Sequence, residues 1–250
     1  MTLHSEFAIE FTHVDYAVSA DHALLSDLNL SVRHHETLVL LGKSGSGKTT
    51  TLKLINLLLV PTSGEVRVEG RSTLEWNPIR LRRRIGYAVQ EVGLFPHYTV
   101  EENVALVPKA EKWDKRRIRT RVEDTLALVG LQFPEFADRY PHELSGGQRQ
   151  RVGLARALAA NPPFLLMDEP FGALDPITRA QLQREFATLS KRLGTTVVFV
   201  THDVAEALLL GDRIALIENG SAAGVYSRSE FLASSDETIR AYRETSRLSA

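Results

Sequence analysis

Eight consecutive residues near the start of the chain have the types and the spacing of a phosphate-binding loop, GxxxxGK[ST]. They are Gly42, Lys43, Ser44, Gly45, Ser46, Gly47, Lys48 and Thr49. Glycines let backbone N–H groups converge on an anion, and the N-terminus of a following helix adds a partial positive charge. In this pattern Lys48 reaches the β- and γ-phosphates, and the Thr49 hydroxyl binds Mg²⁺. The loop, with the adjoining Thr50, therefore predicts a site for ATP and Mg²⁺.

The flanking sequence supplies the elements that such a loop needs. Residues 36–41, ETLVLL, predict a buried strand, and residues 48–59 predict a helix. Strand, glycine-rich loop and helix start are the context in which this pattern binds phosphate. The alternative is a glycine-rich turn that binds nothing, but the strand, the spacing, the lysine and the threonine all agree with a phosphate site.

A second glycine-rich segment precedes another predicted helix, at residues 146–160. Its residues are Leu144, Ser145, Gly146, Gly147 and Gln148. Backbone N–H groups and the start of a helix again supply positive potential. Because the chain already has one phosphate loop, a second anion site predicts that two copies of the protein hold ATP between them. We expect these five residues to contact ATP that is bound to the partner copy.

An acidic pair ends the apolar run at residues 164–167, FLLM. Four apolar residues fit a strand that is buried on both faces. Asp168 at its end is placed to hold Mg²⁺, directly or through water. Glu169 is the candidate that acts on the attacking water, either as a general base or as a water-positioning group. The alternative is a strand end that carries two solvated acids.

Composition limits the classes of protein that the chain can represent. It has 250 residues, a formal net charge of −1 and no cysteine. A chain of this length can bury ~70–75% of its unfolded surface in one core, and the lack of disulfides suits the cytosol. No apolar run approaches the ~18–20 residues that span a bilayer, and residues 1–10 lack the apolar core of a signal peptide. We therefore expect any membrane domain to belong to another polypeptide.

The chain is predicted to form one domain over residues 1–250, with an inserted helical part. The core comprises residues 1–90 and 145–228, where strands and helices alternate as in a parallel sheet. Residues 91–144 contain four prolines and a charged helical run, and form the helical subdomain. Residues 229–250 predict one or two amphipathic helices.

Two basic runs, at residues 80–84 and 115–121, raise the question of nucleic-acid binding. Acidic residues interleave the second run, which is typical of a solvated face with local ion pairs. The chain has no excess of positive charge, so we expect no nucleic-acid partner.

The order of these motifs resembles the ATP-binding subunits of ABC transporters, from about Phe7 to about Arg243. In that family, the position of Gln90 senses Mg²⁺ and the γ-phosphate, and the position of His202 contacts the γ-phosphate. Residues 144–148 match the family signature, and residues 173–175, which end at Asp175, match the loop that crosses the dimer interface. Taken singly, the glutamine and the histidine would be ordinary polar residues at strand ends.

The resemblance implies an α/β fold of the P-loop NTPase class in its ABC form. It has a mixed sheet core, an inserted helical subdomain and a small antiparallel β part. The implied enzyme is an ATP hydrolase that forms a homodimer on binding ATP. The implied catalytic residues are Lys48, Gln90, Glu169 and His202. The implied Mg²⁺ ligands are Thr49, Gln90 and Asp168. The implied partners are integral membrane permease subunits, which hold the chain at the cytoplasmic face of the inner or plasma membrane, and an external solute-binding protein.

A finer resemblance, carried by residues 90–108, 138–144 and 171–179, is to ATPases that import quaternary-amine osmoprotectants such as glycine betaine, choline and carnitine. Many of these carry paired CBS domains after the core, and the chain ends near where those would begin, so no ionic-strength sensing by such a module is expected. The family stacks adenine on an aromatic residue, but the expected position falls near Val18 or Ser19. Tyr16 is the nearest ring, and a place in the strand core is its alternative role.

Two other classes stay open. The chain is alternatively an ABC importer ATPase for another solute or for a lipid. A non-transport ABC ATPase of DNA repair or translation usually has a long coiled coil or two cassettes, and the sequence has neither feature.

Overall fold

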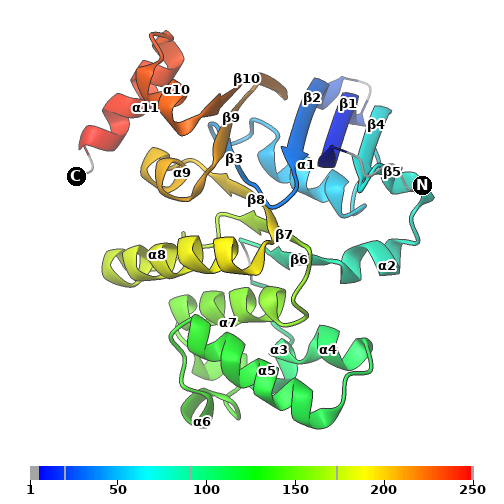
Figure 1. Cartoon of the computed structure of the whole chain (residues 1–250), viewed down its shortest axis with the longest axis vertical. Coiled ribbons are helices and arrows are strands. Elements are labelled where there is room, and N and C mark those ends of the chain that lie inside the picture. The colour runs from blue at the N-terminus through cyan, green and yellow to red at the C-terminus, as the bar shows by residue number, and fades with distance from the viewer. Residues whose placement is uncertain (1–5, 20, 91, 173, 249–250) are drawn as a thin grey trace. The chain divides into compact units, whose positions relative to one another are not determined.

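The computed structural model describes residues 6–19, 21–90, 92–172 and 174–248. Ala173, which was predicted to lie in the interface loop, is outside the described residues, as are Glu91 and the two chain ends. The described chain forms two compact units. The first contains residues up to 82 and from 194 onward, and the second contains residues 83–193. The helices and strands of both are labelled in Figure 1.

The first unit contains an antiparallel sheet with the strand order β2-β1-β4-β5. Its strands are β1 (Phe7–Ser19), β2 (His22–Arg33), β4 (Ser63–Val68) and β5 (Arg71–Ser72). Three apolar residues, one from each of the long strands, are at most 1% exposed: Val14, Leu28 and Val66. Alternation of apolar and polar residues puts these side chains on one buried face.

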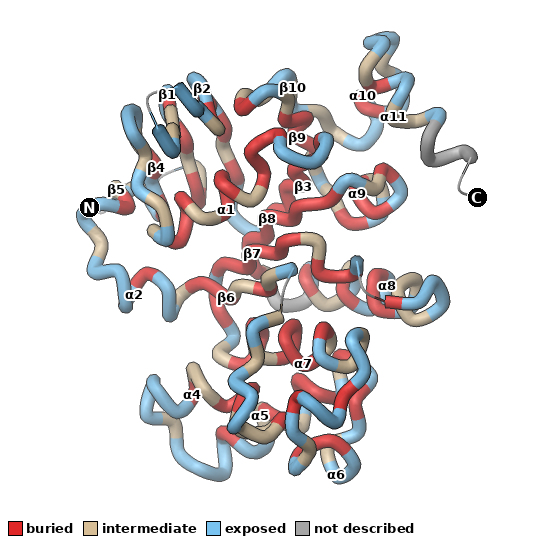
Figure 2. Tube along the Cα trace, turned by 180° about the vertical axis from the view of Figure 1, so that it is seen from behind, coloured by how far each residue is buried: buried red, intermediate tan, exposed pale blue. Residues whose placement is uncertain are grey.

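The first unit also contains parallel strands around the phosphate loop. They are β3 (Thr37–Leu41), β8 (Thr196–Thr201) and β9 (Arg213–Glu218), and β10 (Ser221–Ser227) pairs with β9 in antiparallel fashion. Strand β3 pairs in parallel with β8 on one side and with β9 on the other. Every residue of β3 and β8 is buried, as Figure 2 shows, which fits strands covered on both faces.

The helices of the first unit are short. They are α1 (Lys48–Ile55), α2 (Pro78–Arg83), α9 (Val204–Leu210), α10 (Arg228–Ala233) and α11 (Glu237–Leu248), with a 3-10 turn η1 (Thr73–Glu75). The predicted helix to Leu59 is too long. Leu57 has a left-handed φ of 55°, and the N–H groups of Leu58 and Leu59 both donate to the Lys53 carbonyl, so α1 ends at Ile55. The segment after β10 contains two helices, α10 and α11.

The second unit contains two parallel strands and most of the helices. The strands are β6 (Ile85–Ala88) and β7 (Phe164–Asp168). The helices are α3 (Val100–Val104), α4 (Leu106–Ala110), α5 (Lys115–Leu128), α6 (Phe133–Phe136), α7 (Gly146–Leu158) and α8 (Pro176–Leu193), with a 3-10 turn η2 (Pro141–Glu143). Helix α7 packs against β6, α3 and α5, so the predicted helical segment and these two strands share one packed unit.

None of the helices in the described part of the chain is long and apolar enough to cross a membrane.

Candidate functional site

The phosphate loop connects β3 to α1 and depends on glycine at two positions. A Cβ atom at Gly42 would lie 2.3 Å from the Ile217 carbonyl oxygen. Gly47 has a φ of 102°, and a Cβ atom there would lie 2.6 Å from a methyl group of Leu25. Both the close approach and the left-handed backbone exclude larger residues. The loop is therefore held tightly between β9 and β2.

The N-terminus of α1 is suited to an anion. Within the described residues no side chain caps this helix end, and its first turn contains no acidic residue. The first N–H groups of a helix have no partner inside the helix, so they and the helix dipole favour a negative ligand. Among the described residues, the Ser46 hydroxyl is buried and has no hydrogen-bond partner. A phosphate oxygen would satisfy this donor, so the loop fits the ligand that the sequence predicts.

Lys48 is folded over the loop. It is only 6% exposed, and its Nζ donates to the carbonyl oxygens of Gly42 at 2.8 Å and Lys43 at 2.7 Å. A buried ammonium group needs such acceptors to compensate for lost hydration. The positive charge is thus held at the loop. Thr49 and Thr50 follow it in the first turn of α1.

His202 lies at the same edge of the parallel strands as the phosphate loop. Leu41, the last residue of β3, pairs in register with Thr201, the last residue of β8. Gly42 and His202 are the next residues along the two strands, so both leave the sheet at its carboxyl edge. Asp203 then caps α9 by accepting hydrogen bonds from the N–H groups of residues 205 and 206. His202 is thereby fixed between a buried strand and a capped helix.

Tyr16 lies one strand away from the phosphate loop. It is half-buried on β1, and its register partner on β2 is Leu25. Leu25 is the residue whose methyl group limits the space at Gly47. Val18 is 64% exposed and Ser19 is also exposed. Tyr16 is thus a half-buried residue whose strand partner packs against the phosphate loop.

The acidic strand lies in the second unit. All five residues of β7 are buried, and Asp168 at its end is 5% exposed. Glu169 has a left-handed φ of 45°, and β7 ends one residue earlier, at Asp168. The Glu169 carbonyl accepts a hydrogen bond of 3.4 Å from the Gln150 side chain of α7. Burial, and secondarily the charge of Asp168, raise the pKa of the Tyr87 hydroxyl, so this neighbour stays neutral.

Gln90 leaves the sheet at the same edge as Glu169. Ala88 of β6 pairs with Met167 of β7, so Gln90 and Glu169 each lie two residues beyond this pair. Gln90 is exposed. The two parallel strands of the second unit therefore end with an amide and two carboxylates beside one another. Oxygen ligands of this kind are the ones that Mg²⁺ prefers.

The signature segment forms the N-terminus of α7. Ser145 is the N-cap: its Oγ accepts from the Gln148 N–H at 3.2 Å, and its own N–H donates to Gln148 Oε1 at 2.8 Å. This capping box uses an acceptor site of the hydroxyl and leaves its proton free to donate elsewhere. The Leu144 carbonyl accepts from Arg149 at 2.6 Å. A Cβ atom at Gly146 would meet nothing nearer than 4.0 Å. Packing inside the chain therefore does not require glycine there.

Asp175 caps the start of α8. Its carboxylate accepts from the Thr178 N–H at 3.0 Å. Hydrogen bonds from the Thr178 backbone and side chain hold the pKa of Asp175 below its usual range. Asp175 is exposed and charged at neutral pH, whereas the neighbouring Leu174 is buried.

Two residues near the candidate site were not found from the sequence. Arg156 of α7 donates to the carbonyls of Val92 at 2.8 Å and Gly93 at 2.9 Å, so it ties the signature helix to the segment after Gln90. Tyr242 of α11 lines a cavity of about 300 Å³ together with residues 43–46 of the phosphate loop. Both depend on contacts between segments far apart in the chain, and no local pattern signals them.

Comparisons with known proteins agree with this geometry. The family model described as ABC transporter matches residues 25–172. The chain is 50% identical over 208 residues to the glycine betaine/carnitine/choline transport ATP-binding protein OpuCA of Bacillus subtilis, which covers 83% of this chain and 54% of that protein. It is 51% identical over 212 residues to the glycine betaine uptake system ATP-binding protein YehX of Escherichia coli. The matched region covers 85% of this chain and 68% of that protein. The chain thus spans little more than half the length of OpuCA.

Solved structures match as well. The dimeric structure of MJ0796, a bacterial ABC transporter cassette, has a TM-score of 0.81 and 35% identity, and covers 88% of this chain and 98% of that one. The same cassette was solved as a dimer in a post-hydrolysis state with ADP and Pi, with a TM-score of 0.80. The fold class is therefore that of a P-loop NTPase of the ABC type, as predicted. The chain belongs to the ABC transporter family.

Proposed function

We propose that this chain is the ATP-hydrolysing subunit of an ABC importer for quaternary-amine osmoprotectants such as glycine betaine or choline. The observation that carries the ATPase part is the phosphate loop, with a buried lysine, an uncapped helix end and the unpartnered Ser46 hydroxyl. The names of the relatives support the import of osmoprotectants. The chain is held at the cytoplasmic face of the membrane by its permease partners.

ATP binds to the phosphate loop, where Lys48 and the α1 N-terminus stabilise the phosphate charge. Thr49, Gln90 and Asp168 would hold Mg²⁺, which would supply positive charge to the phosphates. Glu169 positions or deprotonates the attacking water, and His202 donates toward the γ-phosphate. Hydrolysis then depends mainly on positioning and on charge stabilisation.

The second half of the site comes from a partner copy. Gly146 is not required by packing within the chain, and the Ser145 hydroxyl keeps its proton free for a donor role. Both features suit contact with a γ-phosphate held by the other copy, and Asp175 lies on the loop proposed to cross the interface. ATP thus joins two chains, and its hydrolysis separates them. The dimeric state of the solved ABC cassettes supports this homodimer.

The permease partner is proposed to dock on the second unit. A cavity of about 380 Å³ there is lined by β6, by the segment after Gln90, by α4 and by the end of α7. Phe95 on its wall is 45% exposed, and Arg156 links this wall to the signature helix. A segment of the membrane subunit that binds here would be linked to both halves of the proposed ATP site. One half is the Gln90 side of this chain, and the other is the signature helix, which contacts the ATP of the partner copy. The external solute-binding protein acts through the permease and makes no contact with this chain.

Reconstitution with the partner permease and binding protein tests the proposal. We expect ATP-dependent uptake of radiolabelled glycine betaine or choline in proteoliposomes, and no uptake with the Lys48→Ala variant. If the complex hydrolyses ATP and transports only another class of solute, the substrate assignment fails and the ATPase assignment stands. If no ATP hydrolysis accompanies any transport, the whole proposal fails.

A further inference from the structure

Strand β1 contains a β-bulge at His13. Phe11 pairs with Leu30 and Val14 pairs with Leu28, so one extra residue of β1 lies between these two pairs. His13 has a left-handed φ of 48°, a conformation that His, Asn and Asp tolerate better than most residues. The bulge lets Phe11 and Val14 share the buried face although they are three residues apart.

Strand β2 contains a matching bulge at Asp27, whose φ is 49°. Val14 pairs with Leu28 and Tyr16 pairs with Leu25, so here the extra residue belongs to β2. The second bulge restores the register that the first one shifts. With the register restored, Tyr16 lies opposite Leu25, and either bulge alone would shift this pairing by one residue.

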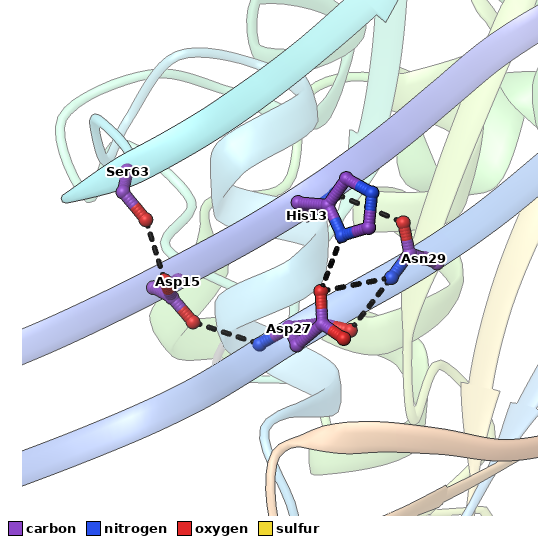
Figure 3. Close-up of polar contacts among 5 residues, drawn as sticks. All are labelled: His13, Asp15, Asp27, Asn29 and Ser63. Atoms are coloured by element: carbon purple, nitrogen blue, oxygen red, sulfur yellow. Dashed lines mark hydrogen bonds and ion pairs between the residues drawn. The ribbon is translucent and has the colours of Figure 1, made fainter.

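Five polar residues hold the two bulges together, and we call them the bulge cluster (Figure 3). Asp27 Oδ1 lies 2.7 Å from His13 Nδ1, and it accepts from Asn29 Nδ2 at 3.0 Å. Asp15 accepts from the Asp27 N–H at 2.7 Å and from the Ser63 hydroxyl at 2.5 Å. The His13 N–H donates to Asn29 Oδ1 at 2.9 Å. The cluster therefore joins β1, β2 and β4 through both left-handed residues.

The bulge cluster continues directly to the residues that flank Tyr16. The Asp15 carbonyl accepts from the Thr62 N–H at 2.8 Å. The Ala17 N–H donates to the Thr62 hydroxyl at 2.8 Å. The backbone on each side of Tyr16 is thus tied to the same turn before β4, which limits where its ring can lie.

The part of the bulge cluster on β2 is connected to the phosphate loop through backbone hydrogen bonds. Ser26, the residue before the second bulge, donates its N–H to the Gly220 carbonyl at 3.1 Å. The Gly220 N–H in turn donates to the Ser46 carbonyl at 3.2 Å. Leu25 packs closely against Gly47. A short chain of hydrogen bonds and one close contact therefore fix the distance between the Tyr16 strand pair and the loop that binds phosphate.

We propose that the bulge cluster positions the Tyr16 ring against adenine, with Asp15 and Asp27 as the positioning residues. The proposal rests on the proposed ATP site and on Tyr16 as the ring that stacks on the base. Left-handed backbone at two non-glycine residues persists where the surrounding structure determines it, and it is common beside functional sites. The polar side chains of the cluster lie toward solvent, so the apolar core does not require them.

The test compares ATP, which contains adenine, with tripolyphosphate, which has the phosphates but no adenine. We would measure binding of Mg·ATP and Mg·tripolyphosphate to the full chain by calorimetry. Asp15→Ala should weaken ATP binding about fivefold, the scale of one aromatic stacking contact, and leave tripolyphosphate binding unchanged. Tyr16→Ala should give the same pattern. Glu65→Ala, which removes a half-buried carboxylate that pairs with Arg67 on its own strand, is the matched control and should bind both ligands normally.

Two variants at Asp27 distinguish a role of the cluster in positioning Tyr16 from a role in folding. Asp27→Asn keeps an acceptor oxygen and the tolerance for left-handed backbone, so it should retain ATP affinity, whereas Asp27→Ala should lose about fivefold. An equal loss for ATP and tripolyphosphate in Asp15→Ala would overturn the proposal, because the cluster would then support the phosphate loop as a whole. An effect of Tyr16→Ala without any effect of Asp15→Ala also overturns it, and leaves the proposed ATPase function intact.

Discussion

Ser46→Ala should make the nucleotide-free protein more stable and the ATP complex weaker. The Ser46 hydroxyl is buried and has no partner among the described residues. A buried donor without a partner costs about 1–3 kcal/mol, so its removal should raise the free energy of unfolding by about 1 kcal/mol. For a chain of this length that corresponds to a rise in Tm of about 2–4 °C. A lost hydrogen bond to a charged phosphate should lower affinity by about 1.5–3 kcal/mol, or about 10- to 150-fold.

Thermal unfolding with and without Mg·ATP, together with calorimetric titration, measures both effects. Thr51→Val is the matched control, because the Thr51 hydroxyl is also buried but donates to the Gly47 carbonyl at 3.0 Å. Its loss should lower the free energy of unfolding by about 1 kcal/mol. The reasoning is refuted if Ser46→Ala destabilises the nucleotide-free protein as the control does, or if its ATP affinity equals that of the unchanged chain.

Three further predictions concern charge. Lys48→Ala should lose most ATP affinity, because a charge-assisted phosphate contact disappears; equal affinities in a titration would contradict this. Ser145→Arg should bind ATP normally yet fail to dimerise, and a dimer seen by sedimentation would count against the trans contact. Hydrogen bonds, chiefly from Ser63 to Asp15 and from His13 to Asp27, hold the pKa of both carboxyls below 3.8. Their stabilising effect is present above the ordinary carboxyl pKa and is lost as pH falls through the lowered pKa of the folded state, so the free energy of unfolding should fall on acidification below the ordinary carboxyl pKa, and less steeply in Asp27→Asn.

Much of the candidate site could be predicted from the sequence because its signals are local. The phosphate loop, the acidic strand and the signature each combine a strand or helix pattern with glycines or acids at fixed spacing. The strand predicted at residues 36–41 is β3 (Thr37–Leu41), the apolar run at residues 164–167 lies in β7 (Phe164–Asp168), and every residue of both strands is buried. Ser145 also starts α7 where the predicted helix begins.

The remainder depends on contacts that no local pattern encodes. The bulges at His13 and Asp27 interrupt the alternation of apolar and polar residues, so the position of Tyr16 could not be derived by counting along the strand. Leu57 ends α1 early through a left-handed backbone angle at a residue with good helix propensity. The link from Arg156 to the segment after Gln90 joins residues 63 and 64 positions apart.

The most direct measurement is the mass of the Glu169→Gln variant in solution, by light scattering, with and without Mg·ATP. The variant should bind ATP and hydrolyse it almost not at all, because the group that acts on the attacking water is lost. The account predicts the mass of one chain, 27.8 kDa, without nucleotide and twice that mass with ATP. A single-chain mass under both conditions, or an equally stable dimer under both, would contradict the claim that ATP joins two copies of this protein.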